Sequence, residues 1–163
     1  RRFNFLYGDG LPEPEAMLTE TPKILGTDRR KMSKSYDNAI YLSDTPDDIA
    51  SKVAQMITDP QRARRSDPGN PDVCNVFSFH KIYTDSATVA EIDTQCRKAE
   101  IGCVECKKIM ARHLIDALEP IREKRRFYEE RPQRVEEVIQ EGCRRARNVA
   151  RNTMEEVRAA IHI

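Results

Sequence analysis

Two lysines and two serines occupy the five residues Lys31–Ser35, which read Lys-Met-Ser-Lys-Ser and follow a turn-prone stretch at residues 26–30. The segment brings two mobile ammonium groups and several hydroxyl and backbone donors to one place. A polyphosphate requires such donors when a phosphorus–oxygen bond breaks and negative charge moves onto the leaving oxygens. An ordinary solvated loop can have the same composition. We interpret the segment as a phosphate-binding loop and call it the lysine loop.

Four cysteines form a second pattern with chemical meaning. They are Cys74, Cys96, Cys103 and Cys106, with twenty-one, six and two residues between them, and Cys143 lies apart. Structural disulfides are rare inside cells, whereas a C-x-x-C pair on one helical turn suits a metal centre. Four thiolates fit either a tetrahedral zinc ion or a [4Fe–4S] cluster. Zinc sites more often contain two close pairs, and free buried thiols are the third alternative.

Local arginine clusters are the candidate contacts for nucleic acid, since 28 basic and 27 acidic side chains leave a formal net charge of only +1. Arg144, Arg147, Arg151 and Arg158 share one face of the last expected helix. A loop carries a second group, Arg62, Arg64 and Arg65. Each group is either a solvated face or a phosphate-binding surface. A third group, at residues 122–126, is mixed with acids, and we interpret it as solvated.

Helices are expected to follow residue 45. Thr45 is a good N-cap, Pro46 suits the first helical position, and two acids come next. Asp59-Pro60 should end this helix, and residues 59–75 form a long loop. Further helices are expected at roughly 76–84, 86–100, 103–129 with a disturbance at Pro120, and 132–161.

Apolar stripes on these helices predict a compact helical bundle. The expected core residues of the first helix are Ile49, Val53, Met56 and Ile57. Those of the helix at 103–129 are Cys103, Cys106, Met110, Leu114, Leu118 and Ile121. Those of the last helix are Ala146, Ala150, Met154, Val157 and Ile161. The three histidines, His80, His113 and His162, are scattered and expected at the surface or half-buried.

The residues before 45 are of mixed character, with a short strand candidate at Lys23-Ile24-Leu25. A nucleotide-binding α/β domain needs more strands and crossover helices than this length supplies. We therefore expect the C-terminal part of a longer protein. No run of eighteen apolar residues is present, so a membrane span is not expected, and without a secretory signal a cytoplasmic location is the default.

The lysine loop reproduces the KMSKS signature of class I aminoacyl-tRNA synthetases, and other short motifs accompany it. They include Arg2-Phe3-Asn4, Pro12-Glu13-Pro14, Asp37-Asn38-Ala39-Ile40, Thr58-Asp59-Pro60, Leu118-Glu119-Pro120-Ile121-Arg122 and the arginine-rich run 142–151. In this order they resemble the bacterial tryptophanyl-tRNA synthetase family from the middle of the catalytic domain to the C-terminus. In the stretch Asp28-Arg29-Arg30, arginine stands where members of the family often carry glycine.

The resemblance implies a two-step reaction in which tryptophan is activated by ATP with Mg²⁺ and then transferred to tRNA(Trp). Lys31 and Lys34 would hold the leaving pyrophosphate, Ser33 and Ser35 would bind phosphate oxygens or shape the loop, and the Met32 backbone would lie by the adenine. Residues 1–44 would be the end of a Rossmann-like catalytic domain. Residues 45–163 would be a helical domain that binds the tRNA anticodon. The full-length enzyme would be a homodimer.

The resemblance also bears on the cysteines and on the completeness of the site. Some members of the family bind a [4Fe–4S] cluster through four cysteines with a long gap followed by gaps of six and two. Here the last two gaps match and the long gap is one residue shorter. The cluster is therefore the favoured interpretation, with zinc as the alternative. The family's His-x-Gly-His-like element and tryptophan pocket would lie upstream, so this chain alone should be inactive.

Two rival functions remain. A standalone RNA-binding helical module with a metal centre would explain the arginines and cysteines but would leave the lysine loop without a task. A nucleotidyltransferase of similar α/β fold would use related phosphate chemistry but would need no helical tail.

Overall fold

The computed structural model describes residues 1–19, 21 and 23–162, and this part of the chain is mainly helical. The α-helices are α1 (Arg2–Tyr7), α2 (Pro46–Gln55), α3 (Asn75–Tyr83), α4 (Ser86–Arg97), α5 (Cys103–Glu129) and α6 (Pro132–Ala160). Two short 3₁₀ helices are η1 (Lys34–Tyr36) and η2 (Pro71–Val73). The mainly helical fold expected from the sequence is confirmed.

The strand expected at residues 23–25 is wrong. In the described part of the chain, this segment makes only an isolated antiparallel bridge between Leu25 and Lys31. A strand requires a neighbour that pairs its backbone along several residues. Here the pairing ends at the tight turn that separates the two bridge partners, so no ladder extends from it.

The chain divides into two units. One comprises Thr19–Lys124, and the other comprises Arg1–Leu18 with Arg125–Ile163. The division of the chain into a catalytic part at 1–44 and a helical domain at 45–163 stays a prediction.

Helix α2 begins as its sequence predicts. The Thr45 hydroxyl accepts a 3.1 Å hydrogen bond from the Asp48 backbone N–H, and the Asp48 carboxylate accepts one of 3.1 Å from the Thr45 N–H. Pro46 occupies the first turn. This reciprocal cap satisfies two backbone donors that a helix start otherwise leaves open. The helix ends at Gln55, earlier than Asp59-Pro60, and Ile57 lies beyond it with 43% of its surface exposed, so its assignment to the core is wrong.

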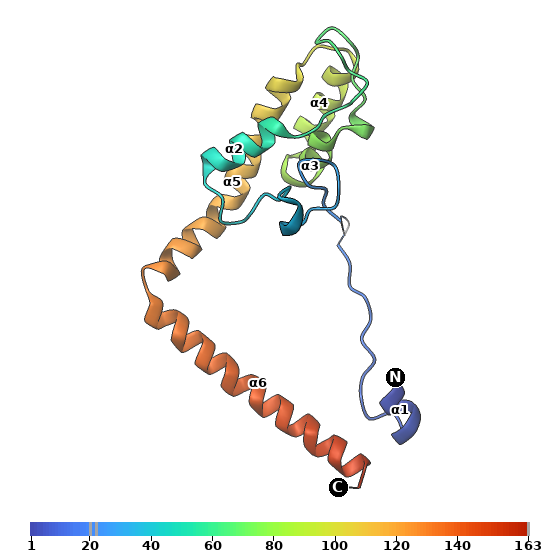
Figure 1. Cartoon of the computed structure of the whole chain (residues 1–163), viewed down its shortest axis with the longest axis vertical. Helices are drawn as coiled ribbons and strands as arrows, with labels where there is room; N and C mark the ends of the chain where they lie inside the picture. The colour runs from blue at the N-terminus through green and yellow to red at the C-terminus, as the bar shows by residue number, and fades with distance from the viewer. Residues whose placement is uncertain (20, 22, 163) are drawn as a thin grey trace. The chain divides into compact units, whose positions relative to one another are not determined.

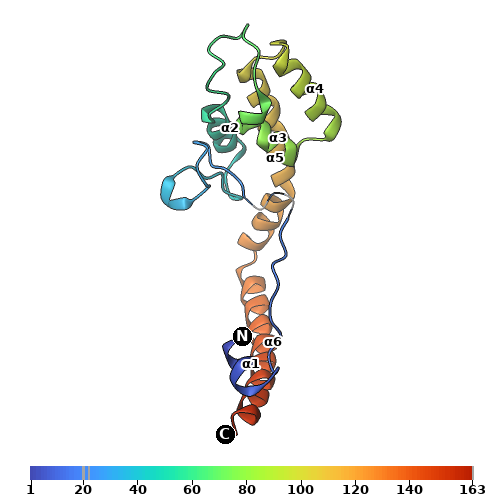
Figure 2. The ribbon, with the colours of Figure 1, turned by 90° about the vertical axis from the view of Figure 1, so that its right-hand side faces the viewer.

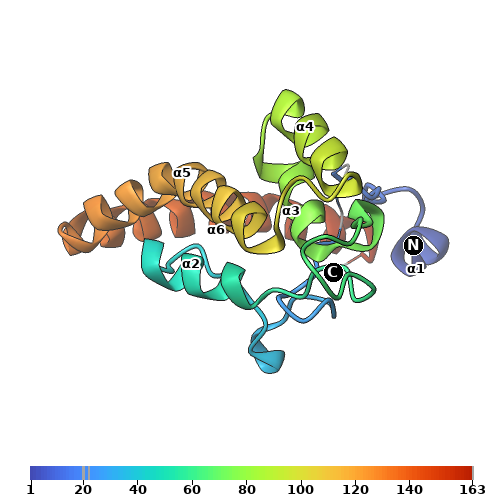
Figure 3. The same cartoon turned by 90° about the horizontal axis from the view of Figure 1, so that it is seen from above.

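The core of the unit Thr19–Lys124 lies where α2, α3 and α5 come together, as Figures 1 and 3 show. Helix α4 adds the buried Ile92 beside this core. The buried core residues are Ile49, Val53 and Met56 from α2, Val76 and Phe79 from α3, and Met110, Ala111, Leu114 and Leu118 from α5. The core therefore confirms the main apolar stripes of α2 and α5.

The α5 stripe stops after Leu118. Ile121 was expected in the core but is 41% exposed, whereas the next residue, Arg122, is buried. The Arg122 guanidinium is held by the Glu119 carboxylate and by a 2.8 Å hydrogen bond to the Ile115 carbonyl. Pro120 lies inside α5, which continues through it to Glu129, so the expected disturbance does not end the helix.

Helix α6 contains no buried residue. The core role expected for its stripe is therefore wrong: Met154 is 44% exposed, and the stripe's other members are exposed or half-buried. An amphipathic stripe becomes core only where another apolar surface covers it fully. No helix in the described residues combines the length and apolar character needed to cross a membrane.

Candidate functional site

The lysine loop lies at the end of a tight hairpin-like turn. The Gly26 N–H donates to the Arg30 carbonyl over 2.7 Å, and the Met32 N–H donates to the Ile24 carbonyl over 3.3 Å. Within the turn, Arg29 has a φ of 68°. Glycine adopts this left-handed conformation more easily than arginine does.

One buried side chain, Asn38, joins the two ends of this turn. Its Nδ2 donates to the Asp28 carboxylate at 2.7 Å and to the Lys31 carbonyl at 3.2 Å. Its Oδ1 accepts a 2.8 Å hydrogen bond from the Ser33 N–H. A Cβ atom on Gly26 would come within 2.3 Å of the Asn38 side chain, so only glycine fits there. The sequence interpretation quoted Asn38 within a motif but gave it no role.

The ammonium groups of Lys31 and Lys34 remain available. Both side chains are exposed, and neither has a hydrogen bond or ion pair within the described residues. Arg30, by contrast, pairs with the Asp28 carboxylate at 2.6 Å. Figures 2 and 3 show that the short 3₁₀ helix η1, which begins at Lys34, stands out from α2 and α3 of the same unit. The two lysines can therefore meet an anion without first breaking an ion pair.

The hydroxyls of Ser33 and Ser35 lie 2.9 Å apart and form a hydrogen bond with each other. Met32 is half-buried and packs against the helical core. Within this segment, the methionine anchors the loop while the lysines and serines are left for polar contacts. This division of roles gives a physical reason for the apolar Met32 between the cations Lys31 and Lys34.

Hydrogen bonds attach the turn to the helices. The buried Asn75 side chain at the start of α3 donates to the Gly26 carbonyl at 2.7 Å. The Ile57 N–H donates to the Thr27 carbonyl at 3.0 Å. Sequence reasoning missed Asn75, because an asparagine at a helix start carries no signal of a partner 49 residues away.

The four cysteines of the predicted metal centre share one neighbourhood. Cys74 precedes α3, Cys96 lies in the last turn of α4, and Cys103 and Cys106 lie in the first turns of α5. All four are half-buried. Burial, followed by repulsion from the other three thiols, raises the pKa of Cys106 to about 12. The structure thus brings together one cysteine that precedes α3, one from the end of α4 and two from the start of α5.

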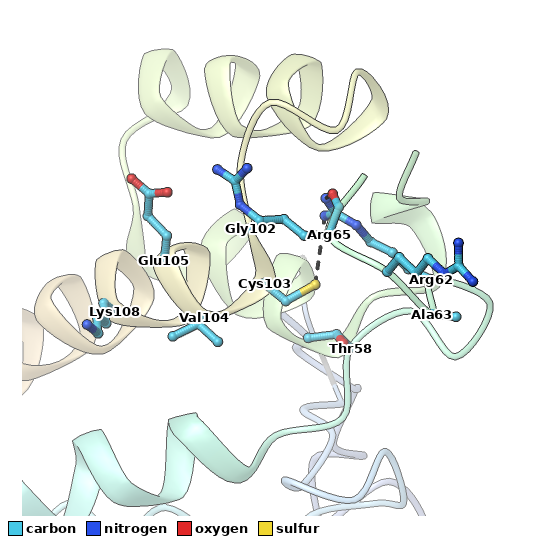
Figure 4. A pocket seen from close by; sticks show the side chains of 10 residues that line it. Thr58, Arg62, Ala63, Arg65, Gly102, Cys103, Val104, Glu105 and Lys108 are labelled. Carbon is cyan, nitrogen blue, oxygen red and sulfur yellow. Dashed lines mark hydrogen bonds between the residues drawn. The ribbon is translucent and has the colours of Figure 1, made fainter. Parts of the chain in front are cut away.

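The donor chemistry of four thiols fits a thiolate-bound metal ion or cluster. Within residues 1–19, 21 and 23–162, no group of three or more His, Cys, Asp or Glu side chains is arranged to hold a metal ion. The Arg62 guanidinium lies against two sulfurs, with Nη1 at 3.9 Å from Cys96 Sγ and 3.8 Å from Cys103 Sγ. Figure 4 shows the contact between Arg62 and Cys103. The metal centre stays a prediction.

His80 corrects the interpretation of the histidines. It is fully buried rather than at the surface. Its Nδ1 lies 2.9 Å from the Thr84 hydroxyl, and its Nε2 lies 3.5 Å from Cys106 Sγ. Burial is the main cause that lowers the pKa of His80 to about 4, so the ring is neutral at neutral pH. His113 is half-buried and His162 exposed, as expected.

The arginines of α6 are not equivalent. Arg144 is held by Glu141 through hydrogen bonds of 2.7 and 2.9 Å. Arg147 and Arg151 are exposed, and the described residues give them no ion pair. The latter two are therefore the better placed of the predicted tRNA contacts.

The loop arginines border a basic cavity of about 710 Å³, shown in Figure 4. Arg62, Arg64 and Arg65 line it with Lys108 and the first residues of α5. Arg62 is engaged, since its Nη2 donates to the Arg65 carbonyl at 2.7 Å and to the Ile101 carbonyl at 2.9 Å. Arg64 and Arg65 supply exposed positive charge.

Comparison with known proteins identifies the class of protein that combines this loop with this helical unit. The family described as tRNA synthetases class I (W and Y) matches residues 1–119, which include the lysine loop and the four cysteines. The chain belongs to this family.

The relatives point to one member of that class. A tryptophan–tRNA ligase of Aquifex aeolicus is 55% identical over 164 residues, covering 100% of this chain and 42% of the relative. One from Thermotoga maritima is 46% identical, covering 100% of this chain and 50% of the relative. This chain therefore spans about half the length of the curated relatives it matches.

A solved structure gives the same result. The tryptophanyl-tRNA synthetase of Campylobacter jejuni, complexed with ADP and tryptophan, matches with a TM-score of 0.80 and 26% identity. The match covers 99% of this chain and 50% of that one. The helical fold described above is therefore the fold of that part of a known synthetase.

Proposed function

We propose that this chain is part of a tryptophan–tRNA ligase that activates tryptophan with ATP and transfers it to tRNA(Trp). The observation that carries the proposal is the pair of exposed ammonium groups of Lys31 and Lys34, which have no ion pair among the described residues and lie on a turn held by Asn38. Relatives named tryptophan–tRNA ligase cover the whole chain at 55% and 46% identity and support this choice of amino acid.

In the activation step, the tryptophan carboxylate attacks the α-phosphorus of ATP. A carboxylate oxygen–phosphorus bond forms, the bond to the β-phosphate oxygen breaks, and pyrophosphate leaves with the electron pair. Lys31 and Lys34 are proposed to stabilise the charge that develops on this leaving group, because lysine is a movable point charge on a flexible stem. Mg²⁺ bound to ATP would share that charge.

The other residues of the lysine loop have supporting roles in this proposal. Ser33 and Ser35 would exchange their mutual hydrogen bond for phosphate oxygens, and the Met32 backbone would lie by the adenine. The remaining parts of the active site, including the tryptophan pocket, would be supplied by the half of the ligase that this chain does not cover. We propose that the full-length enzyme is a homodimer and that this chain alone is inactive.

For tRNA, we propose that residues 45–163 bind the anticodon region while residues 1–44 belong to the catalytic domain. Arg147 and Arg151, together with Arg144, would contact phosphates along α6, and the loop arginines 62, 64 and 65 would provide a second contact. The absence of ion pairs at Arg147 and Arg151 in the described residues supports this surface.

We also propose that Cys74, Cys96, Cys103 and Cys106 hold a [4Fe–4S] cluster, with zinc as the alternative. The 6-and-2 spacing and the shared neighbourhood of the four thiols support it. A bound metal would stabilise thiolates that burial alone disfavours. Anaerobic purification followed by iron, sulfide and zinc analysis tests this part; a metal-free protein whose melting is unchanged by Cys103→Ser would contradict it.

Aminoacylation by the full-length ligase that contains this chain tests the function. Charging of tRNA(Trp) with tryptophan, and no charging with tyrosine, is the expected result. Failure to charge tRNA(Trp) would contradict the proposal.

The rival function of a standalone RNA-binding module rests on the unpaired arginines of α6. A gel-shift assay separates the two candidates. Preference of the full-length protein for tRNA(Trp) over an unrelated tRNA is expected for the ligase, and equal binding of both RNAs favours the module.

A further inference from the structure

The lysine loop has mobile side chains on a fixed backbone, and one residue fixes that backbone. Asn38 is only 2% exposed, and its carboxamide contacts Asp28 before the loop and both Lys31 and Ser33 within it. These three hydrogen bonds span the chain on either side of the first lysine. The Thr27 N–H also donates to the Asn38 carbonyl at 2.9 Å, which holds the asparagine backbone in place.

We propose that Asn38 is the positioning residue of the lysine loop, setting where the Lys31 and Lys34 ammonium groups meet the leaving pyrophosphate. The inference rests on the proposed function of those two lysines. Asn38 does not touch the phosphates in this proposal. It acts by holding the Lys31 carbonyl and the Ser33 N–H at a fixed separation. The backbone that carries the two lysine side chains therefore keeps a constant position.

The chemistry of this position requires a carboxamide. Nδ2 faces two oxygen acceptors, and Oδ1 faces one N–H donor. An aspartate at position 38 could accept from Ser33 but could not donate, and its charge would face the Asp28 carboxylate at hydrogen-bonding distance. A glutamine would be too long, because the backbone of Gly26 already lies against the Asn38 side chain.

Asp28 completes the arrangement. Hydrogen bonds from Asn38, and then from Arg30, lower the pKa of the Asp28 carboxyl, which therefore stays ionised at neutral pH. The Arg30 guanidinium also lies 4.6 Å from the centre of the Tyr36 ring, and Tyr36 follows Lys34 by two residues. These contacts thus connect the turn, through Asp28 and Arg30, to the far end of the lysine loop.

A variant series in the full-length ligase tests the proposal. Asn38→Asp should lower the rate of tryptophan-dependent ATP–pyrophosphate exchange by about a hundred-fold, the effect expected when a reacting group is misplaced by about 1 Å. The dissociation constant for tryptophan should not change. The swap Asp28→Asn with Asn38→Asp restores the hydrogen bond between positions 28 and 38 but not the one to the Lys31 carbonyl, and should recover only part of the rate. Asn148→Asp, at an exposed position of α6, is the matched control.

A double-mutant cycle that combines Asn38→Asp with Lys34→Ala separates a positioning role of Asn38 from an effect on stability alone. If Asn38 acts through the lysines, Asn38→Asp should cost much less in a Lys34→Ala background than in the wild type. Should Asn38→Asp fold poorly, as judged by thermal melting, Asn38→Ser serves in its place, since it replaces the carboxamide with a shorter hydroxyl and introduces no charge.

The outcomes are distinct. Suppose that Lys34→Ala lowers the exchange rate strongly. If the effects of Lys34→Ala and Asn38→Asp on that rate are then fully additive, or if neither Asn38 variant changes it, the positioning role alone is overturned. An unchanged rate for Lys34→Ala itself would overturn the proposed function of the lysines.

Discussion

The side-chain amide of Asn75 donates a 2.7 Å hydrogen bond to the carbonyl of Gly26, across 49 residues of sequence. Both residues are buried. The bond joins the first turn of α3 to the turn from which the lysine loop begins. The helical core therefore sets the position of the backbone that carries the two candidate catalytic lysines.

Replacing Asn75 should weaken this attachment. Asn75→Ala leaves the buried Gly26 carbonyl without its donor, at a cost of about 1–3 kcal/mol in the free energy of unfolding. Urea unfolding of the protein measures the change. Asn148→Ala, on the exposed face of α6, should alter stability by less than about 0.5 kcal/mol. Equal stability of the two variants would show that the bond does not contribute.

The N-cap of α2 gives a second stability prediction. Thr45→Ala removes the hydroxyl that accepts from the Asp48 N–H and should cost about 1 kcal/mol. Thr45→Ser retains the hydroxyl and should remain close to the wild type. Thermal or urea unfolding compares them; if the serine variant lost as much as the alanine variant, the hydroxyl would not be the stabilising group.

Two methionines test the difference between the helical core and α6. Met110 is fully buried in the core, whereas Met154 on the α6 stripe is 44% exposed. Met110→Ala should cost about 2–5 kcal/mol because it leaves a cavity among packed side chains. Met154→Ala in this chain should cost less than about 0.5 kcal/mol. A comparable loss at Met154 would mean that another surface covers the stripe in solution.

Cysteine alkylation provides a fourth test. In metal-free protein at neutral pH, a small alkylating reagent should modify the exposed Cys143 first and the four half-buried cysteines slowly. After anaerobic reconstitution with iron and sulfide, those four should be fully protected while Cys143 still reacts. Peptide mass spectrometry reads each site. Modification of Cys103 at the same rate before and after reconstitution would contradict the proposed centre.

The sequence predicted the helices well because their local signals agree with their packing. Thr45 and Pro46 mark the start of α2, and the spacing of Met110, Leu114 and Leu118 marks the buried face of α5. The prediction failed where burial depends on a partner surface. The α6 stripe has the same periodicity, but none of its residues is buried.

The candidate site was predicted in part for a related reason. Lys31 and Lys34 are recognisable because their chemistry lies in consecutive residues. Asn38 and Asn75 act through hydrogen bonds that depend on the folded backbone, and a single asparagine carries no periodic signal. The burial of His80 beside Cys106 was missed likewise, because the two residues are 26 positions apart and the sequence between them gives no sign of the contact.

The most direct test of the central claim is the single-turnover rate of tryptophanyl-adenylate formation by the full-length ligase with Lys31→Ala and Lys34→Ala. The Lys124→Ala variant serves as the control, because Lys124 is exposed and has no ion pair within the described residues. Removal of a charge that stabilises the leaving pyrophosphate should lower this rate by about a hundred-fold or more, with tryptophan binding unchanged. Adenylate formation at the wild-type rate in both lysine-loop variants would contradict the account.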